Sequence, residues 1–359
     1  MLRGPGFALT PRSNMRYPVA GALTLCSVAG AGFSYLGAPL PWMIGPLLAM
    51  ACGRSFGACL AAPKWGRALG QMVIACALGL YFTPPVAREI ADHWPFLVAA
   101  GLYAVVLAYA SGWFLTQSAA LDGTTALFAS VPGGAAEMTV LGERFGARLD
   151  RVVLAQSLRV ILVVVAVPFG FAFLGLHGVD AYQLSRPEVS ASGLAALLAG
   201  AAAAGAIFSR LRVPNAWMLG PLAVSIGCTL AEVHLSAVPA IASNAAQVLL
   251  GCALGAGFDR KSLRSAPRFI VMVLISIVLG MILSVTFAWV MAVWGGFAVA
   301  TMVLATAPGG MAEMCITAKV LRLGVPLVTA AHLARVVILV TTTAPTFRIA
   351  RYIKRGLSR

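Results

Sequence analysis

One short motif occurs twice and carries the residues of this chain that are best suited to ion or substrate binding. The copies read SVPGGAAEM over 130–138 and TAPGGMAEM over 306–314. Proline removes a backbone donor and disfavours helix before it, and paired glycines weaken the helix further. A helix that restarts after such a break presents free N–H groups that favour an anion. The predicted binding residues are Pro132, Gly133, Gly134, Glu137, Pro308, Gly309, Gly310 and Glu313.

An arginine follows each motif inside another apolar run, Arg159 after the first copy and Arg335 after the second. They lie roughly 10 Å and 13 Å into their predicted helices, at about 1.5 Å per residue. A charge at such depth costs at least ~2.5 kcal/mol unless it finds a partner or a cavity. Two interpretations stay open for the arginines: an ion pair with Glu137 or Glu313, or contact with an anionic substrate group. The glutamates either complement the dipoles of the restarted helices, neutralise the arginines, or bind a coupling H⁺ or Na⁺.

Seven further polar or aromatic residues are candidates for supporting roles. Gln156 and His332 precede the arginines by three positions and share their helix face. His332 either packs through a hydrogen bond or relays protons. The remaining glutamines favour hydrogen bonds between helices, and the tryptophans favour packing or interfacial positions over a cavity-lining role. The seven are Gln71, Gln247, Trp42, Trp217, Asn215, Gln156 and His332.

The elements that must position these residues are membrane helices. Of the 359 residues, 60% are hydrophobic and 10% are charged, and the mean hydropathy is +0.91. Soluble chains carry about 25% charged residues, so the composition predicts an all-α integral membrane protein. The net charge of +15 lies mostly in short loops and at the termini. The positive-inside bias explains this pattern, so we expect no direct nucleic-acid partner.

Metal and redox chemistry find little support in the sequence. The seven cysteines form no C-x-x-C motif and lie mostly within apolar runs, as small packing residues do. The four histidines show no pair at ligand spacing on a helix. We therefore predict no catalytic residue, no metal, no cofactor beyond a coupling ion, and no enzyme activity.

The chain is an internal duplication. AGAGFSYLGAPLPWMIGPL over 29–47 matches AGAIFSRLRVPNAWMLGPL over 204–222, and the motif and its arginine also recur, all at an offset of 175–176 residues. Asn215 is one position that breaks the symmetry of the duplication, since its equivalent is Leu40. We predict two membrane repeats, 17–175 and 193–350, joined by a linker over 176–192. Basic cytoplasmic segments, 1–16 and 351–359, flank them.

The charges between the apolar runs predict that the two repeats are inverted. Arg12 and Arg16 precede the first helix, whereas Arg210 and Arg212 follow its equivalent. Inversion needs an odd number of crossings per repeat, yet each repeat has six apolar segments. We therefore predict five transmembrane helices plus one broken Pro-Gly-Gly re-entrant segment per repeat, with both termini cytoplasmic. A discontinuous full crossing is the alternative, so the predicted total is 10–12 membrane segments.

The two P-x-x-W-[ML]-[IL]-G-P-L copies, the two P-G-G-x-x-E-M copies and the arginine after each are the features that carry a family resemblance. In these residues the chain resembles the AbrB family, the "AbrB duplication" proteins of the bacterial inner membrane. Members have been labelled regulators of gene expression or ammonia monooxygenases. The resemblance implies a multi-pass inner-membrane location and supplies no catalytic residues. The scattered histidines make an oxygenase an unsuitable interpretation.

Paired broken helices in an inverted repeat are typical of secondary transporters. The leading prediction is transport of a small anionic or zwitterionic metabolite coupled to H⁺ or Na⁺. The alternative is a membrane sensor that affects gene expression indirectly. The expected partners are the lipid bilayer and a small solute, and a homodimer is left open.

Overall fold

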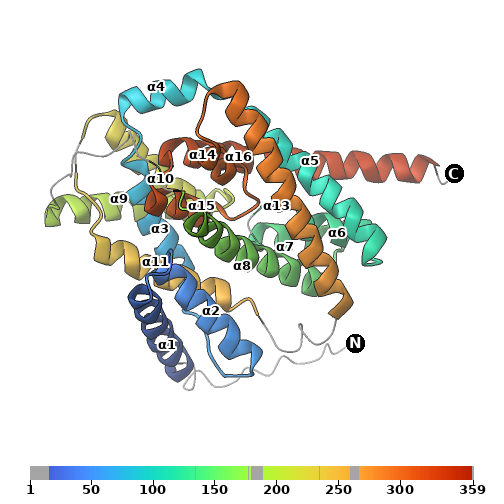
Figure 1. The fold of residues 1–359 in the computed structure, drawn as a ribbon, viewed down its shortest axis with the longest axis horizontal. Coiled ribbons are helices and arrows are strands. Elements are labelled where there is room, and N and C mark those ends of the chain that lie inside the picture. Colours follow the sequence, from blue (N-terminus) through green and yellow to red (C-terminus); the bar gives the residue numbers. More distant parts are fainter. Residues whose placement is uncertain are drawn as a thin grey trace.

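The computed structural model describes residues 16–133, 135–176, 178, 189–233, 235–258 and 267–357, with the side chains of 16–17, 134–137 and 343–357 outside the description. Within these ranges every regular element is a helix, as predicted (Figure 1). The first repeat holds α1 (Arg16–Tyr35), α2 (Pro41–Ser55), α3 (Gly66–Gly79), α4 (Pro84–Asp92), α5 (Trp94–Ser118), α6 (Gly123–Ser130), α7 (Ala135–Arg144) and α8 (Leu149–Phe173). The second holds α9 (Ala191–Arg210), α10 (Ala216–Leu230), α11 (Ala240–Gly255), α13 (Pro267–Gly295), α14 (Val299–Thr306), α15 (Met311–Leu321) and α16 (Val325–Leu357).

Six of the described helices are long and apolar enough to cross a membrane: α1, α5, α8, α9, α13 and α16. The pair α3 and α4, bent by 92°, would add a seventh if counted as one span. Three other predicted segments, α2, α10 and α11, have only 15, 15 and 16 residues. At about 1.5 Å per residue these helices are shorter than a hydrocarbon core of ~30 Å. A multi-pass membrane protein is supported, while the count of ten crossings stays a prediction.

The two repeats interlock and do not stand side by side. Helix α2 packs against α11 of the other repeat, and its counterpart α10 packs against α3. In the same way α5 packs against α16, and α13 packs against α8. These main contacts between the repeats therefore occur in pairs in which the roles of the two repeats are exchanged.

Glycines allow the crossing helices to approach at backbone distance. A Cβ atom at Gly255 of α11 would lie 2.6 Å from the carbonyl oxygen of Leu47 in α2. At Gly70 of α3 it would lie 2.8 Å from the carbonyl of Ala246 in α11. Small residues at helix crossings are the usual basis of tight packing in membranes.

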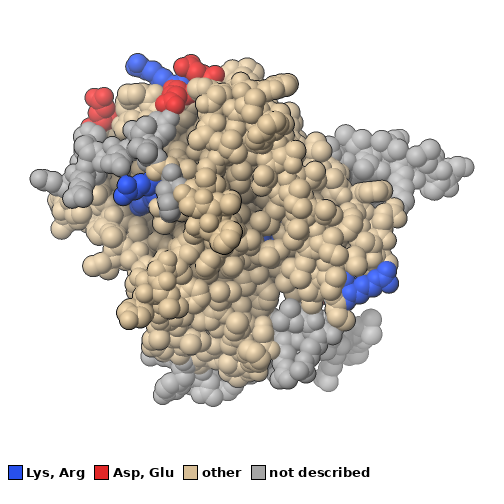
Figure 2. Space-filling model, in the orientation of Figure 1, with Lys and Arg blue, Asp and Glu red and all other residues tan. Residues whose placement is uncertain are grey.

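The outer surface suits a lipid environment. Figure 2 shows one face whose middle is almost free of charged side chains, with Lys, Arg, Asp and Glu near its margins. Large apolar side chains stand exposed along α5 and α13, including Val106 at 65% and Trp289 at 58%. An exposed apolar surface of this extent is stable against lipid tails and would be a liability in water.

Candidate functional site

Both motif copies interrupt a helix, as the sequence predicts. Helix α6 ends at Ser130 and α7 begins at Ala135, while α14 ends at Thr306 and α15 begins at Met311. The interruptions free the last carbonyl groups of α6 and α14, which need donors when they are buried. Gly134 and the side chain of Glu137 lie outside the described residues.

Arg159 supplies donors to the first break. Its Nη1 donates to the carbonyl of Val131 at 2.8 Å, and its Nη2 donates to the carbonyl of Gly133 at 3.2 Å. Nη2 also donates to Oε1 of Gln156 at 2.6 Å. Arg159 is 5% exposed, so the guanidinium caps the carboxyl end of a half-helix inside the protein. A cation suits that negative end of the helix dipole.

Arg335 does the same at the second break. Its Nη1 donates to the carbonyl of Ala307 and its Nη2 to the carbonyl of Gly309, both at 2.7 Å. Arg335 is 3% exposed. The two arginines stand equally far from the first residues of α8 and α16, Leu149 and Val325. The duplication therefore preserves the contacts as well as the motif.

Gln156 and His332 complete these two caps. Nε2 of Gln156 donates to the carbonyls of Phe128 at 2.9 Å and Val131 at 3.0 Å. Nε2 of His332 lies 2.9 Å from the carbonyl of Leu304, the residue equivalent to Phe128, and therefore donates to it. The two side chains differ chemically but meet the same backbone requirement. Of the two interpretations of His332, the geometry matches hydrogen-bonded packing.

The ion pair expected between Arg335 and Glu313 is not the observed arrangement. The recorded ion pairs among the described residues are those of Asp150 with Arg148 and Arg151. Arg335 instead directs its terminal nitrogens at backbone oxygens, which no side-chain pattern in the sequence could reveal. Its Nε is buried and has no hydrogen-bond partner among the described groups.

Glu313 lies in the first turn of α15, at the restarted helix end. Glu313 is 6% exposed, and its carboxylate lies beside Gly310. A carboxylate at this position complements the positive end of the helix dipole. The predicted dipole role is therefore met by the geometry, and the predicted ion-coupling role remains open.

Both breaks border one cavity of about 70 Å³, here called the central cavity. Pro132 and Gly133 reach it from the first repeat, and Gly309, Gly310 and Glu313 reach it from the second. Its other polar or charged lining residues are Arg67, Gln71, Asn215 and Arg335. Two arginines and one glutamate give this described lining a net formal charge of +1, which suits an anion.

Gln71 and Asn215 meet at the wall of the central cavity. Nε2 of Gln71 donates to Oδ1 of Asn215 at 3.0 Å. Asn215 precedes α10 with a φ of 51°, a left-handed conformation that asparagine tolerates better than most residues. The residue that breaks the symmetry of the duplication thus places an amide in the central cavity.

Arg67 is the lining residue that sequence reasoning missed. The sequence pattern groups it with the basic residues between apolar runs, yet it lies in α3 and lines the central cavity. Arg67 precedes Gln71 by four positions and so shares its helix face. The four-residue spacing between Arg67 and Gln71 was the sequence feature that could have identified Arg67 as a lining residue.

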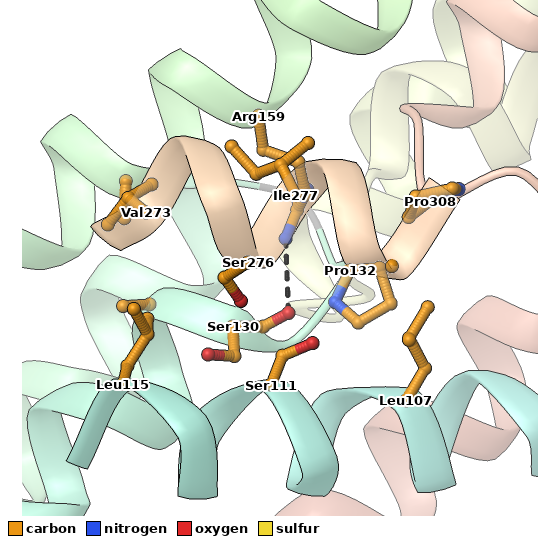
Figure 3. A pocket seen from close by; sticks show the side chains of 13 residues that line it. Leu107, Ser111, Leu115, Ser130, Pro132, Arg159, Val273, Ser276, Ile277 and Pro308 are labelled. Carbon is orange, nitrogen blue, oxygen red and sulfur yellow. Dashed lines mark hydrogen bonds between the residues drawn. The ribbon is translucent and has the colours of Figure 1, made fainter. Parts of the chain in front are cut away.

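A smaller pocket of about 30 Å³ lies beside the central cavity, and Pro132 borders both. It is called the serine pocket because Ser111 of α5, Ser130 of α6 and Ser276 of α13 line it (Figure 3). Arg159 and Pro308 complete its polar and motif-derived lining. Figure 3 shows Arg159 reaching the backbone of Ser130, at 3.4 Å from Nη1 to the carbonyl oxygen.

The remaining predicted residues lie elsewhere. Trp42 and Trp217 pack against Gly30 and Gly205, where an added Cβ atom would stand 2.8 Å from each ring. Neither tryptophan lines the central cavity or the serine pocket, so packing describes both. Gln247, the equivalent of Gln71, lines a different cavity bordered by α3, α11 and α15.

Comparison with known proteins identifies the family. The family model AbrB, described as "Transition state regulatory protein AbrB", matches residues 42–351. The chain belongs to the AbrB family. An AbrB relative from Escherichia coli (strain K12), named "Putative regulator AbrB", is 28% identical over 290 residues, covering 80% of this chain and 83% of that protein. Another, "Uncharacterized protein YhjN" from Bacillus subtilis (strain 168), is 26% identical over 369 residues and covers 92% of each chain.

Proposed function

We propose that this AbrB-family protein is a secondary transporter of a small anionic or zwitterionic metabolite, with H⁺ or Na⁺ as the coupling ion. The observation that carries the proposal is the convergence of both Pro-Gly-Gly breaks on the central cavity. Discontinuous helices facing one polar site are the usual arrangement in transporters built from inverted repeats. The two repeats would then cross the membrane in opposite directions, with one break entering from each side.

The lining of the central cavity accounts for the proposed selectivity. Arg67 has no recorded hydrogen bond or ion pair with another described residue, so its charge is available to a ligand. Arg335 lines the same cavity and brings a second positive charge to it. The first turn of α15 adds backbone N–H groups, because Gly310, Met311 and Ala312 line the same cavity. These donors suit a carboxylate or a comparable anion.

Glu313 provides the site for the coupling ion. It borders the central cavity beside Arg335, within reach of a proton or Na⁺ entering with the anion. Neither proton nor Na⁺ coupling needs a catalytic residue or an organic cofactor, so we propose no enzyme activity. The proposed location is the bacterial inner membrane with both termini cytoplasmic.

Uptake into proteoliposomes tests the transport proposal. The full chain is reconstituted and offered small mono- and dicarboxylates and zwitterionic amino acids under an inward H⁺ or Na⁺ gradient. We expect gradient-dependent uptake of at least one compound. Arg67→Gln should reduce that uptake at least tenfold, and Glu313→Gln should abolish its dependence on the gradient. Lys64→Gln is the matched control, because Lys64 is exposed and does not line the central cavity.

A sensor is the second candidate, and the name of the Escherichia coli relative favours it. The same cavity would then bind its ligand without moving it across the membrane. Saturable binding that Arg67→Gln weakens, combined with no uptake of any compound in the panel under either gradient, would support the sensor and exclude the transporter.

A further inference from the structure

A second cavity with polar lining residues lies further along α15, between Glu313 and the end of the helix. Its volume is about 290 Å³, and α3, α11 and α15 contribute most of its lining. The same three helices also border the central cavity, through Gln71, Leu254 and Glu313. At about 30 Å³ per water molecule, this space has the volume of about ten waters, enough for a small organic molecule.

The polar groups of this cavity come from two helices. On α11, Ser243 and Gln247 are spaced by four positions and therefore share a face, and Asn244 stands beside them. On α15, Lys319 supplies the only charged side chain of the described lining. The described structure records no ion pair and no hydrogen bond for the ammonium group of Lys319, which is half-buried, so the described lining carries one positive charge without a recorded counter-ion.

Ser243 gives an independent indication of a missing ligand. The residue is 8% exposed, and its Oγ is buried without a hydrogen-bond partner among the described groups. A buried hydroxyl left unpaired costs ~1–3 kcal/mol, so it is expected to have a partner when the site is filled. Gln247 is 7% exposed and lines the same space.

The apolar part of the lining limits the kind of ligand. Ile74, Leu78, Val238 and Ile316 face the same cavity. An anion held by an ammonium, a hydroxyl and an amide would therefore carry a short hydrocarbon portion as well. A small monocarboxylate has both features, whereas an inorganic anion would leave the apolar wall uncovered.

We infer that this cavity is a second binding site, for a small aliphatic monocarboxylate, with Lys319 as the counter-ion and Ser243 and Gln247 as hydrogen-bond donors. The inference goes beyond the proposed function, because the site is separate from the central cavity and requires no transport.

Binding of butyrate to the purified full chain in detergent tests the inference. Saturation-transfer NMR of the butyrate methyl group reports binding, and butyramide, which has the same shape without the charge, is the matched control ligand. We expect a butyrate signal that butyramide does not give. Lys319→Gln should reduce this signal at least fivefold and Ser243→Ala about threefold, while Lys319→Arg should retain it.

Variants of the central cavity separate the two sites. Arg67→Gln and Glu313→Gln should alter uptake, while the part of the butyrate signal that Lys319→Gln removes should persist in both variants. Gel filtration checks that each variant is folded. If Lys319→Gln does not fold, the butyrate signal of Ser243→Ala, which removes one atom from the cavity wall, tests the inference instead. No butyrate signal from the wild type, or a signal that Arg67→Gln removes and both Lys319→Gln and Ser243→Ala retain, would overturn the inference.

Discussion

One carboxylate oxygen of Glu313 lies too close to Gly310 to leave room for the Cβ atom of another residue at that position. The φ of Gly310 is −75°, which other residues adopt readily. A larger residue at 310 is therefore opposed by the carboxylate and not by the backbone, and the carboxylate, as the end of a flexible side chain, would have to move aside to admit it.

Gly310→Ala should displace the Glu313 carboxylate from the central cavity. Because the carboxylate can move aside, we expect the free energy of unfolding to fall by less than the ~1–3 kcal/mol of overpacking against fixed atoms, while gradient-driven uptake falls clearly. Thermal unfolding in detergent and proteoliposome uptake measure the two effects. Gly227→Ala is the control, because a Cβ atom there meets nothing within 4 Å and alanine stabilises a helix by up to ~1 kcal/mol. Equal behaviour of the two variants would contradict the clash.

Arg335→Lys should destabilise the protein although it preserves the charge. The guanidinium spans two carbonyls, of Ala307 and Gly309, and an ammonium has no such fork. Losing a hydrogen bond from a charged donor costs about 1.5–3 kcal/mol, which thermal unfolding will detect. Arg88→Lys on the exposed face of α4 is the control and should leave the unfolding temperature unchanged. A wild-type stability for Arg335→Lys would show that charge alone suffices.

His332→Gln should preserve both folding and gradient-driven uptake. The equivalent Gln156 already donates to the carbonyl of Phe128 as His332 donates to that of Leu304. His332→Leu removes the donor and should lower the free energy of unfolding by about 1–3 kcal/mol. Both are measured by thermal unfolding and by uptake under a pH gradient. Uptake lost in a stable His332→Gln protein would instead assign proton transfer to the imidazole.

Gly255→Ala should loosen the contact between the two repeats. Its Cβ atom would lie 2.6 Å from the carbonyl oxygen of Leu47 and 2.7 Å from Cβ of Met50, both on α2. Neither atom is the end of a flexible side chain, so the helices must move apart, at about 1–3 kcal/mol. The unfolding temperature should fall, whereas Gly170→Ala, which meets nothing within 4 Å, should not lower it. A tolerated Gly255→Ala would mean that the crossing is not tightly packed.

The helix interruptions were predictable because proline and paired glycines act on their own backbone. The arginines were recognised for a related reason, since a charge deep in an apolar run stands out wherever it points. The hydrogen-bond acceptors of the arginines were not predictable, because every residue has a backbone carbonyl and residue types do not show which carbonyls are left unpaired. Arg67 and Lys319 were missed as lining residues for a different reason. Their roles depend on which helices of the two repeats cross. The spacing of residues shows which of them share a face of a helix, but it does not show which other helix that face packs against.

The exchanged contacts between the repeats imply that this chain is built like a dimer whose two subunits have been joined. A single repeat would leave the faces of α2 and α3 uncovered, and a second copy of itself would cover both. Joining the copies lets the two halves of the site change separately. The two halves already differ at two pairs of equivalent positions, Asn215 and Leu40, and His332 and Gln156.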